Sequence, residues 1–388
     1  MHEPFGTATA TLFEREMINT GTMIENFWRC LRTAGIVFLM ILFAAGCNKD
    51  DICQDIAPVR TILYYMGGDN NLSGEVAVKT ARLQNVLVPQ GCRLLVYCDT
   101  RGGDPQLLDV GNGRISPVCS YPADNSADPA VFAAVFDRVR NLYPAPSYGL
   151  AVFSHASGWM PAGSYASLAL RSIVTDGADE MEIPAFAAAI PDGSLDFILF
   201  EACHMAGIEV AWELKTKTRH IVASSAELVS PGFDPVYEEA MPLLFQPKAD
   251  LEGFCRIIEA NYQRRGAEYA SLTLSLIATA GLDEIASVLH GEQPCANNDV
   301  QSFDRYGKGL FYDLYDGYRN LSDDKRATLR SAIDACVVWK GATAEFMPSY
   351  GGFSIRFHSG LTTYIPNERR RELNEAYKKT AWHRELLK

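Results

Sequence analysis

Residues 149–155 read GLAVFSH, and residues 196–203 read DFILFEAC. Each stretch is an apolar run of strand length that leads into a chemically reactive side chain, His155 in the first and Cys203 in the second. A run that is apolar at every position is typical of a strand buried on both faces of a sheet. We therefore expect His155 and Cys203 to lie directly after two buried strands.

Three further apolar runs predict strands of the same kind, at residues 60–66, 93–98 and 220–224. Segments with helical patterns separate the runs, at residues 72–87, 129–142, 182–190 and 205–216. This alternation predicts an α/β fold in which helices cover both faces of a central, mostly parallel sheet. Chemistry in such folds collects at the carboxyl ends of the strands, so His155 and Cys203 are expected at one edge of the sheet.

From about residue 250 the rhythm of the sequence changes. Helices are expected at residues 250–264, 304–321, 324–336 and from 368, and strands at residues 271–277, 352–357 and 362–365. The chain is therefore divided into a catalytic domain at residues 59–245 and a C-terminal α/β subdomain at residues 246–388 that completes it.

The composition excludes several function classes. The 388 residues are 48% hydrophobic and carry a formal net charge of −12, whereas a nucleic-acid-binding protein usually shows a basic patch. The run of arginines at residues 369–371 fits an exposed helix face. The cysteines of the body form no C-x-x-C pair, so no zinc site is expected. No acidic loop resembles an EF-hand, so no metal site and no cofactor are predicted.

The first 46 residues have the pattern of an export signal. Residues 34–45 read AGIVFLMILFAA, Arg29 and Arg32 precede them, and small residues follow. The run is short for a transmembrane helix, which needs about 20 apolar residues. Met23 is a candidate for the true start of the chain.

Cys47 follows Ala45 and Gly46 in the manner of a lipoprotein attachment site. The resemblance to the bacterial lipobox implies that Cys47 is acylated and becomes the mature N-terminus, with residues 47–58 as a linker. The protein would then be exported and anchored by lipid to the outer membrane. Asn48-Lys49-Asp50-Asp51 resembles a short tag for export to the outer surface.

Cys203 and His155 together indicate nucleophilic catalysis. A cysteine nucleophile requires a nearby base that takes its proton. In caspases the cysteine stands in a Q-A-C signature and the catalytic histidine lies about 50 residues upstream. Here Glu201-Ala202-Cys203 stands 48 positions after His155. One strand-helix-strand unit spans that separation and would place both side chains at adjacent strand ends.

Three segments resemble the motifs of clostripain-like cysteine peptidases. Residues 154–159 (SHASGW) are similar to that family's D-H-G-S-G-W box, residues 201–206 (EACHMA) to its D-A-C-x-M-x box, and residues 65–72 (YMGGDNNL) to its Y-x-x-A-D-N-N-L opening. The resemblance runs from about residue 59 to the C-terminus. It implies a caspase-like three-layer sandwich and an endopeptidase that acts on peptides or proteins.

The resemblance also implies roles for individual residues. Cys203 would attack the scissile carbonyl, and His155 would protonate the leaving amine. The backbone amides of Ala156 and Cys203 would form the oxyanion hole. The family cleaves after Lys or Arg, and the acids that would bind this side chain are Glu201 and Glu227. Some family members use calcium, and many are zymogens that are cut at a basic residue between the histidine and the cysteine.

Arg171 is the only Lys or Arg between His155 and Cys203, and it is therefore the candidate site of self-cleavage. His204, next to the nucleophile, is expected to point away from the site and to serve the structure. Asp69, Asn70 and Asn71 are interpreted as turn-forming residues.

Three positions depart from the family pattern. Glu201 stands in place of an Asp and would shorten the pocket, Ala156 stands in place of a Gly, and Ser154 stands in place of an Asp. These departures support an alternative hypothesis, in which the chain is a catalytically weak or inactive caspase-fold binding protein at the cell surface.

Overall fold

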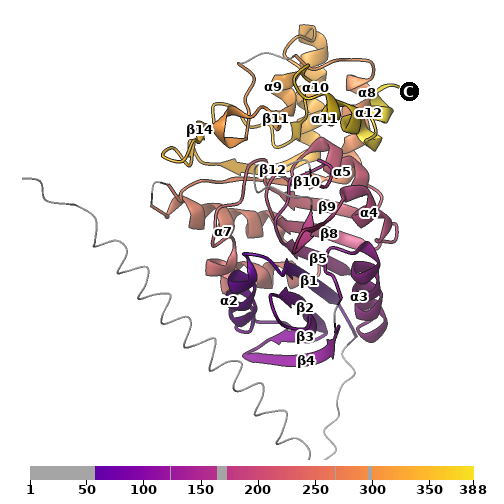
Figure 1. Ribbon diagram of the computed structural model, residues 1–388, viewed down its shortest axis with the longest axis vertical. Helices are drawn as coiled ribbons and strands as arrows, with labels where there is room; N and C mark the ends of the chain where they lie inside the picture. The colour runs from indigo at the N-terminus through magenta and orange to yellow at the C-terminus, as the bar shows by residue number, and fades with distance from the viewer. Residues whose placement is uncertain (1–56, 123, 164–172, 267, 296–298) are drawn as a thin grey trace, which may run out of the picture. The chain divides into compact units, whose positions relative to one another are not determined.

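A computed structural model describes residues 57–122, 124–163, 173–266, 268–295 and 299–388. Nine strands form its central sheet: β1 Arg60–Gly68, β2 Cys92–Thr100, β3 Gln106–Gly111, β4 Arg114–Ser120, β5 Tyr148–Phe153, β8 Leu195–Glu201, β9 Thr218–Ala223, β10 Thr273–Ala278 and β12 Val337–Ala342. Their order across the sheet is β12-β10-β9-β8-β5-β1-β2-β3-β4 (Figure 1). The strands β2, β1, β5, β8 and β9 in the middle are parallel, and the strands at both edges are antiparallel. The mostly parallel sheet expected from the sequence is confirmed.

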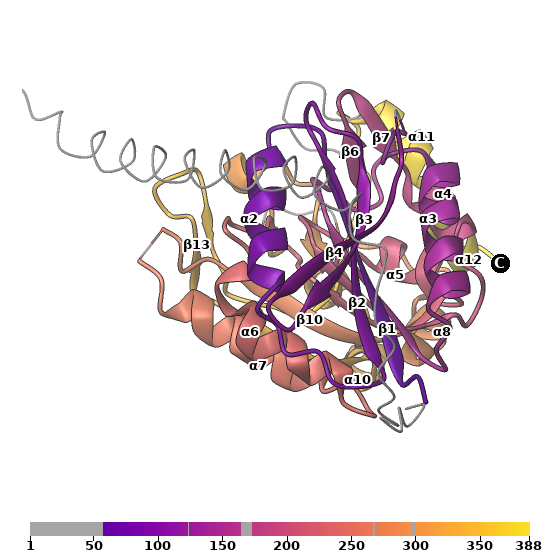
Figure 2. The same ribbon diagram turned by 90° about the horizontal axis from the view of Figure 1, so that it is seen from below.

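Helices cover both faces of this sheet. They are α2 Ser73–Leu83, α3 Pro129–Leu142, α4 Ile183–Ala188, α5 Ile208–Leu214, α6 Tyr237–Ala240, α7 Leu251–Gln263, α8 Leu282–Leu289, α9 Leu314–Gly317, α10 Asp323–Cys336, α11 Arg371–Tyr377 and α12 Ala381–Leu386. Figure 2 shows α2, α6 and α7 on one face of the sheet and α3, α4 and α5 on the other. The three-layer arrangement therefore agrees with the predicted fold class.

Short strand pairs lie outside the central sheet. They are β6 Val174–Asp176 with β7 Asp179–Met181, β11 Tyr312–Asp313 with β15 Thr362–Thr363, and β13 Glu345–Phe346 with β14 Phe353–Ser354. Within the described residues, no helix has the length and apolar character that a membrane span requires. The described cysteines carry free thiols.

Helix α3 illustrates how the sequence produces these layers. The Asp128 side chain accepts a hydrogen bond of 2.8 Å from the backbone N–H of Ala130, and Pro129 occupies the first turn, where its missing N–H costs nothing. Phe132 and Phe136, one turn apart, are buried against the sheet. Helix α2 differs, because its buried face includes a lysine, Lys79.

The register of the central strands positions the site. Strands β5 and β8 are parallel neighbours, and Phe153 on β5 pairs with Glu201 on β8. His155 and Cys203 each follow two residues later, so they occupy equivalent positions beyond the same edge of the sheet. Strand β1 lies on the other side of β5 in the same direction, and its end also reaches this edge.

The helix expected at residues 304–321 is wrong for most of its length. Asp304 accepts hydrogen bonds from the backbone N–H groups of Gly309 at 2.7 Å, Leu310 at 2.9 Å and Phe311 at 3.2 Å. A short polar side chain that bonds the local backbone in this way competes with the helix. Tyr306 adds a left-handed backbone conformation with φ of 63°, so the segment contains a short 3₁₀ helix at Arg305–Gly307 and the short α-helix α9 in place of one long helix.

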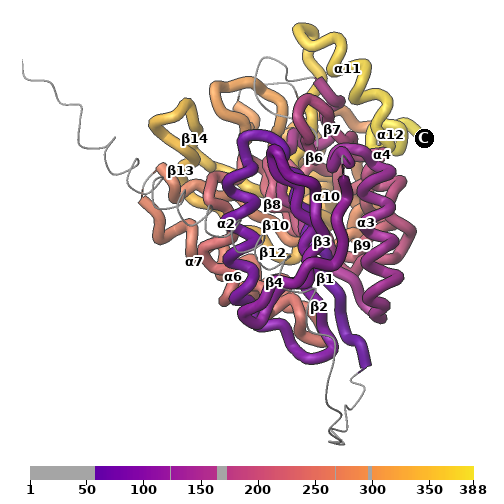
Figure 3. Tube along the Cα trace, turned by 60° about the horizontal axis from the view of Figure 1, so that its bottom comes forward, coloured from indigo at the N-terminus to yellow at the C-terminus, as the bar shows by residue number. Residues whose placement is uncertain are grey.

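The C-terminal part contributes strands β10 and β12 to the central sheet, while the boundary at residue 246 stays a prediction. Its helices α11 and α12 follow one another at the end of the chain (Figure 3), and α12 packs on α5. The buried Glu209 of α5 accepts hydrogen bonds from Thr363 Oγ1 at 2.8 Å and from the backbone N–H of Tyr364 at 2.9 Å. These contacts tie the C-terminal segment to the helix that follows Cys203.

Candidate active site

A cavity of about 370 Å³ opens beyond the carboxyl ends of β5 and β8, and both His155 and Cys203 line it. The predicted substrate-binding residues Glu201 and Glu227 also line this cavity. The other lining residues come from the ends of β5 and β8, from α2 and its preceding turn, from the loop after β9 and from two C-terminal loops: Phe153, Ser154, Ala202, Leu72, Glu75, Leu228, Val229, Ser230, Gly232, Arg305 and Met347. The structure thus brings four of the predicted site residues together around one space.

The thiol of Cys203 is held in a largely desolvated position. Burial raises its pKa to about 12, and the negative charge of Glu227 acts in the same direction. The backbone N–H of Leu228, 3.3 Å from Sγ, and the positive charge of Arg305 oppose this shift. The resting thiol is therefore protonated at neutral pH, and it must lose its proton to a base before it can attack.

The ring of His155 is oriented by Asn71, the residue after the turn that ends β1. Its Nε2 lies 2.7 Å from Asn71 Oδ1. An amide oxygen only accepts hydrogen bonds, so Nε2 carries the proton and Nδ1 is the basic nitrogen of the ring. Asn71 was interpreted from the sequence as a turn former, and its contact with His155 was missed. Asn70 has the expected turn role, because its Oδ1 accepts from the backbone N–H of Leu72 at 2.8 Å.

The residues next to the two reactive side chains are buried. Ala156 is 0% exposed, and its φ is not among the positive values that the described residues show, so its methyl group is accommodated without backbone strain. His204 has φ of 57°, and its ring stacks on Phe311 with 4.0 Å between centroids. Its Nδ1 lies 3.2 Å from the carbonyl oxygen of Ser225. These contacts agree with the structural role expected for His204.

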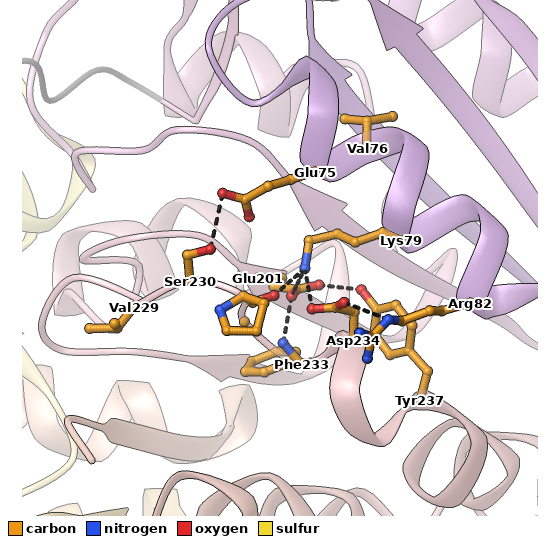
Figure 4. A network of polar contacts seen from close by, with 12 residues as sticks. Glu75, Val76, Lys79, Arg82, Glu201, Val229, Ser230, Phe233, Asp234 and Tyr237 are labelled. Atoms are coloured by element: carbon orange, nitrogen blue, oxygen red, sulfur yellow. Dashed lines mark hydrogen bonds and ion pairs between the residues drawn. The ribbon is translucent and has the colours of Figure 1, made fainter. Parts of the chain in front are cut away.

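Glu201 is the centre of a buried polar network (Figure 4). Its Oε1 accepts from Lys79 Nζ at 2.5 Å and from the backbone N–H of Phe233 at 2.6 Å. Its Oε2 accepts from the hydroxyl of Tyr237 at 2.5 Å and from that of Tyr64. Burial, together with the charge of Glu201, raises the pKa of both tyrosines well above the usual value, so they stay neutral donors.

Two further charged groups complete this network. Lys79 Nζ also lies 3.4 Å from Asp234 Oδ1, and Asp234 Oδ2 lies 3.1 Å from Nε of Arg82. Both cations stand on α2, while Glu201 ends β8 and Asp234 lies in the segment after β9 (Figure 4). Lys79 was not among the residues predicted for the site, although it contacts Glu201, which was predicted to bind substrate.

Glu227 is paired as well, with Arg305, which was not among the predicted site residues either. Arg305 forms two hydrogen bonds to its carboxylate, from Nε to Oε2 and from Nη2 to Oε1, the second at 3.1 Å. Arg305 Nη1 also donates to the carbonyl oxygen of Tyr350 at 3.2 Å. The fork of Arg305 thus fixes Glu227 beside Cys203. Two other predicted residues, Arg171 and Cys47, lie outside the described residues.

A cysteine and a histidine at neighbouring strand ends of a caspase-like sheet define a cysteine peptidase of the α/β class. Residues 64–308 match the model of the clostripain family, named Peptidase_C11. Because the match spans more than half of the chain, this chain belongs to the clostripain family and is a cysteine endopeptidase. No curated protein matches the chain.

Solved structures support the same assignment. An inactive zymogen C11 protease from Parabacteroides distasonis is 27% identical, with 86% of this chain and 99% of that chain covered and a TM-score of 0.74. Two structures of a secreted C11 cysteine protease from Bacteroides thetaiotaomicron are 24% and 21% identical, with TM-scores of 0.74 and 0.75. Each covers 85% of this chain and 99% of its own, and one holds an irreversible peptide inhibitor. The predicted caspase-like fold and family are confirmed.

Replacing Asn71 by Ala should lower kcat by roughly 10- to 100-fold while the fold is retained. The reason is that the ring of His155, the predicted base, would lose the acceptor that fixes its orientation, and small misplacements of a catalytic group carry costs of this size. The pH profile of kcat/KM should also change, because Asn71 favours the form of the ring protonated at Nε2. Steady-state kinetics between pH 5 and 9, with Asn71→Asp as a variant that keeps the acceptor, measure both effects.

Proposed function

We propose that this chain is an exported endopeptidase that hydrolyses peptide bonds through a dyad of Cys203 and His155. The observation that carries the proposal is that both side chains line one cavity, at equivalent positions after the parallel neighbours β5 and β8. The cavity volume of about 370 Å³ is of the size that accepts a substrate side chain.

The proposed reaction begins with proton transfer from the Cys203 thiol to Nδ1 of His155. The thiolate then attacks the scissile carbonyl carbon, and the oxyanion that forms is held by the backbone amides of Ala156 and Cys203. His155 returns the proton to the leaving amine, and an acyl-enzyme remains. Water, activated by His155, hydrolyses that thioester and releases the second product.

We infer that the residue before the scissile bond, the P1 residue, is Lys or Arg. Three carboxylates line the cavity, from Glu75, Glu201 and Glu227. Two of these already have cation partners, since Glu201 binds Lys79 and Glu227 binds Arg305. The preference for a basic residue therefore depends on which carboxylate remains available to the substrate.

Activation by cleavage after Arg171 is part of the proposal. The motivation is its unique position between His155 and Cys203, together with the relative from Parabacteroides distasonis that was solved as an inactive zymogen. A peptide bond cut at this position would be visible as two fragments on a denaturing gel. A fully active protein that stays uncut would contradict this step.

Export and lipid attachment at Cys47 rest on the sequence pattern of residues 34–47. A lipid anchor would hold the peptidase at the outer membrane, with peptides or proteins as its substrates. Metabolic labelling with a fatty-acid analogue tests the attachment, because a protein that carries no label contradicts it.

The alternative is a catalytically weak binding protein of the same fold. The observations that favour it are the half-buried Cys203 thiol, whose pKa desolvation raises to about 12, and the internal pairing of Glu201 and Glu227. A binding protein requires neither an accessible thiolate nor an unpaired acid.

The deciding experiment incubates the purified protein with fluorogenic peptides that carry Arg, Lys, Asp or Ala at P1. Cys203→Ala serves as the control, and a gel follows cleavage at Arg171. We expect cleavage after Lys and Arg that is lost in the control. Cleavage after Asp or Ala instead would keep the peptidase and reject the basic preference. No cleavage by the intact or the processed protein would favour the binding protein.

A further inference from the structure

Glu75 differs from the other carboxylates of the cavity in its partners. It stands in the first turn of α2, is partly exposed and lines the cavity. Its Oε1 accepts a hydrogen bond of 3.1 Å from Ser230 Oγ, a neutral donor. Among the described residues, the ion pairs formed by cavity-lining carboxylates involve Glu201 and Glu227 and not Glu75. Glu75 is therefore the lining acid that keeps room for a cation from the substrate.

Glu201, in contrast, has no remaining capacity. A carboxylate offers about four lone-pair sites, and the four donors to Glu201 fill them. Its side chain is 0% exposed, and that of its partner Lys79 is 1% exposed. Gly232 packs so close to Glu201 that a Cβ at this glycine would overlap Oε1. A basic P1 side chain could reach Glu201 only by displacing Lys79 or one of the other donors.

The charges of the network lead to the same conclusion. Lys79 and Arg82 balance Glu201 and Asp234, so the four groups together have no net charge. Glu75 stands four positions before Lys79, and Figure 4 shows its carboxylate turned toward Ser230 while Lys79 reaches Glu201. The carboxylate of Glu75 therefore carries the negative charge on this wall of the cavity that the two cations do not balance.

The environment of Glu75 also favours a cationic ligand. Burial raises the pKa of its carboxyl group, which means that part of its hydration is lost without full replacement. An ammonium or guanidinium group placed beside it would supply the missing donors as a charge-assisted hydrogen bond. Glu75 and Ser230, hydrogen-bonded to one another from α2 and from the loop after β9, both line the cavity, so a basic side chain that enters the cavity can approach this carboxylate beside Ser230 (Figure 4).

We propose that Glu75 selects a basic side chain at P1, and that Lys79 acts as an internal cation that withholds Glu201 from the substrate. This inference rests on the proposed function, because it names the residue that gives the cavity its substrate preference. In this proposal the basic side chain of the substrate is recognised by Glu75, on the wall of the cavity formed by α2, and not by Glu201 at the floor of the cavity.

The test compares kcat/KM for two peptides that differ only at P1, one with lysine and one with norleucine, which is uncharged. In the wild type the lysine peptide should be preferred. Glu75→Gln should lower the ratio of the two values by roughly 10- to 100-fold, as expected for the loss of a hydrogen bond between charged groups. The double variant Lys79→Met/Glu201→Gln should keep the preference for lysine. Glu239→Gln is the matched control, because Glu239 is exposed on α6 outside the cavity.

The opposite pattern would overturn the proposal: a ratio unchanged in Glu75→Gln and lost in the double variant would make Glu201 the P1 acid. Should the double variant not fold, Glu75→Asp decides, because a preference that survives in Asp and is lost in Gln supports a charge at this position. A wild type that cleaves both peptides equally would reject the inference and leave the peptidase intact. A wild type that cleaves neither peptide, and whose Cys203 does not react with a peptidyl electrophile, would reject the proposed function itself.

Discussion

Replacing Cys203 by Ala should lower kcat/KM by roughly 10⁴- to 10⁶-fold, the size of loss seen when a covalent nucleophile is removed. The reason is that the acyl-enzyme route disappears, and only binding and the oxyanion donors remain. Cys203 lies in a small loop beside its own hydrogen-bond donor, Leu228, so the shorter side chain should leave the fold intact. Initial rates with a lysine peptide, together with a thermal melt, measure activity and folding separately.

His155→Ala provides the second part of this prediction. The thiol of Cys203 is protonated at rest because burial raises its pKa to about 12, so in the proposed dyad its reactivity depends on transfer of that proton to His155. Removing either residue should therefore cost a similar factor, and removing both should cost little more. A His155→Ala variant that keeps one tenth or more of the activity would contradict the dyad. It would also indicate that a different group near Cys203 acts as the base.

The centre of the fold could be predicted because its strands are apolar at almost every position. The runs that became β1, β2, β5, β8 and β9 are mostly buried on both faces, and the run that became β10 has the same pattern. The edge strands are different. In β4 the residues are mostly half-buried or exposed, so β4 carries no continuous apolar signal. The pair Asn112-Gly113, both with positive φ, was an available signal for the hairpin between β3 and β4.

The shared position of the proposed catalytic pair was predictable for a related reason. His155 and Cys203 follow central strands, and the topology of a parallel sheet brings such positions to one edge. Asn71 could have been found in the same way, because it follows β1 and β1 neighbours β5. Asn71 was predicted only as a turn former, since Asn and Asp are common in turns whether or not they have a second role.

The ion-pair partners could not be predicted as readily. Arg305 lies 78 positions from Glu227, and nothing in either segment indicates that a loop outside the central sheet returns to the cavity. The burial of Lys79 could have been predicted more readily, because Lys79 lies on the apolar face of α2, three residues after Val76 and four residues before Leu83. A lysine at such a position predicts a buried carboxylate nearby, since a buried ammonium group requires a partner. The chain does not indicate which acid that is.

Lys79→Met should destabilise the protein by about 3–5 kcal/mol, the typical cost of breaking a buried ion pair by removing one partner. The Lys79 and Glu201 side chains are 1% and 0% exposed, so water cannot replace the lost ammonium group. Glu201 would keep its three other donors, but its charge would be unbalanced. Unfolding in guanidinium chloride, followed by far-ultraviolet circular dichroism, gives the change in the free energy of unfolding.

The companion variants separate the charge from the packing. Glu201→Gln should cost less than Lys79→Met, because Lys79 would still have Asp234, 3.4 Å from its Nζ. The double variant Lys79→Met/Glu201→Gln should recover most of the stability lost in Lys79→Met, since a neutral pair of similar volume is often as stable as a buried ion pair. If the double variant is as unstable as Lys79→Met, the loss comes from packing around α2 and not from an unbalanced charge. Packing of the side chains, and not the balance of charges, would then hold Lys79 and Glu201 in place.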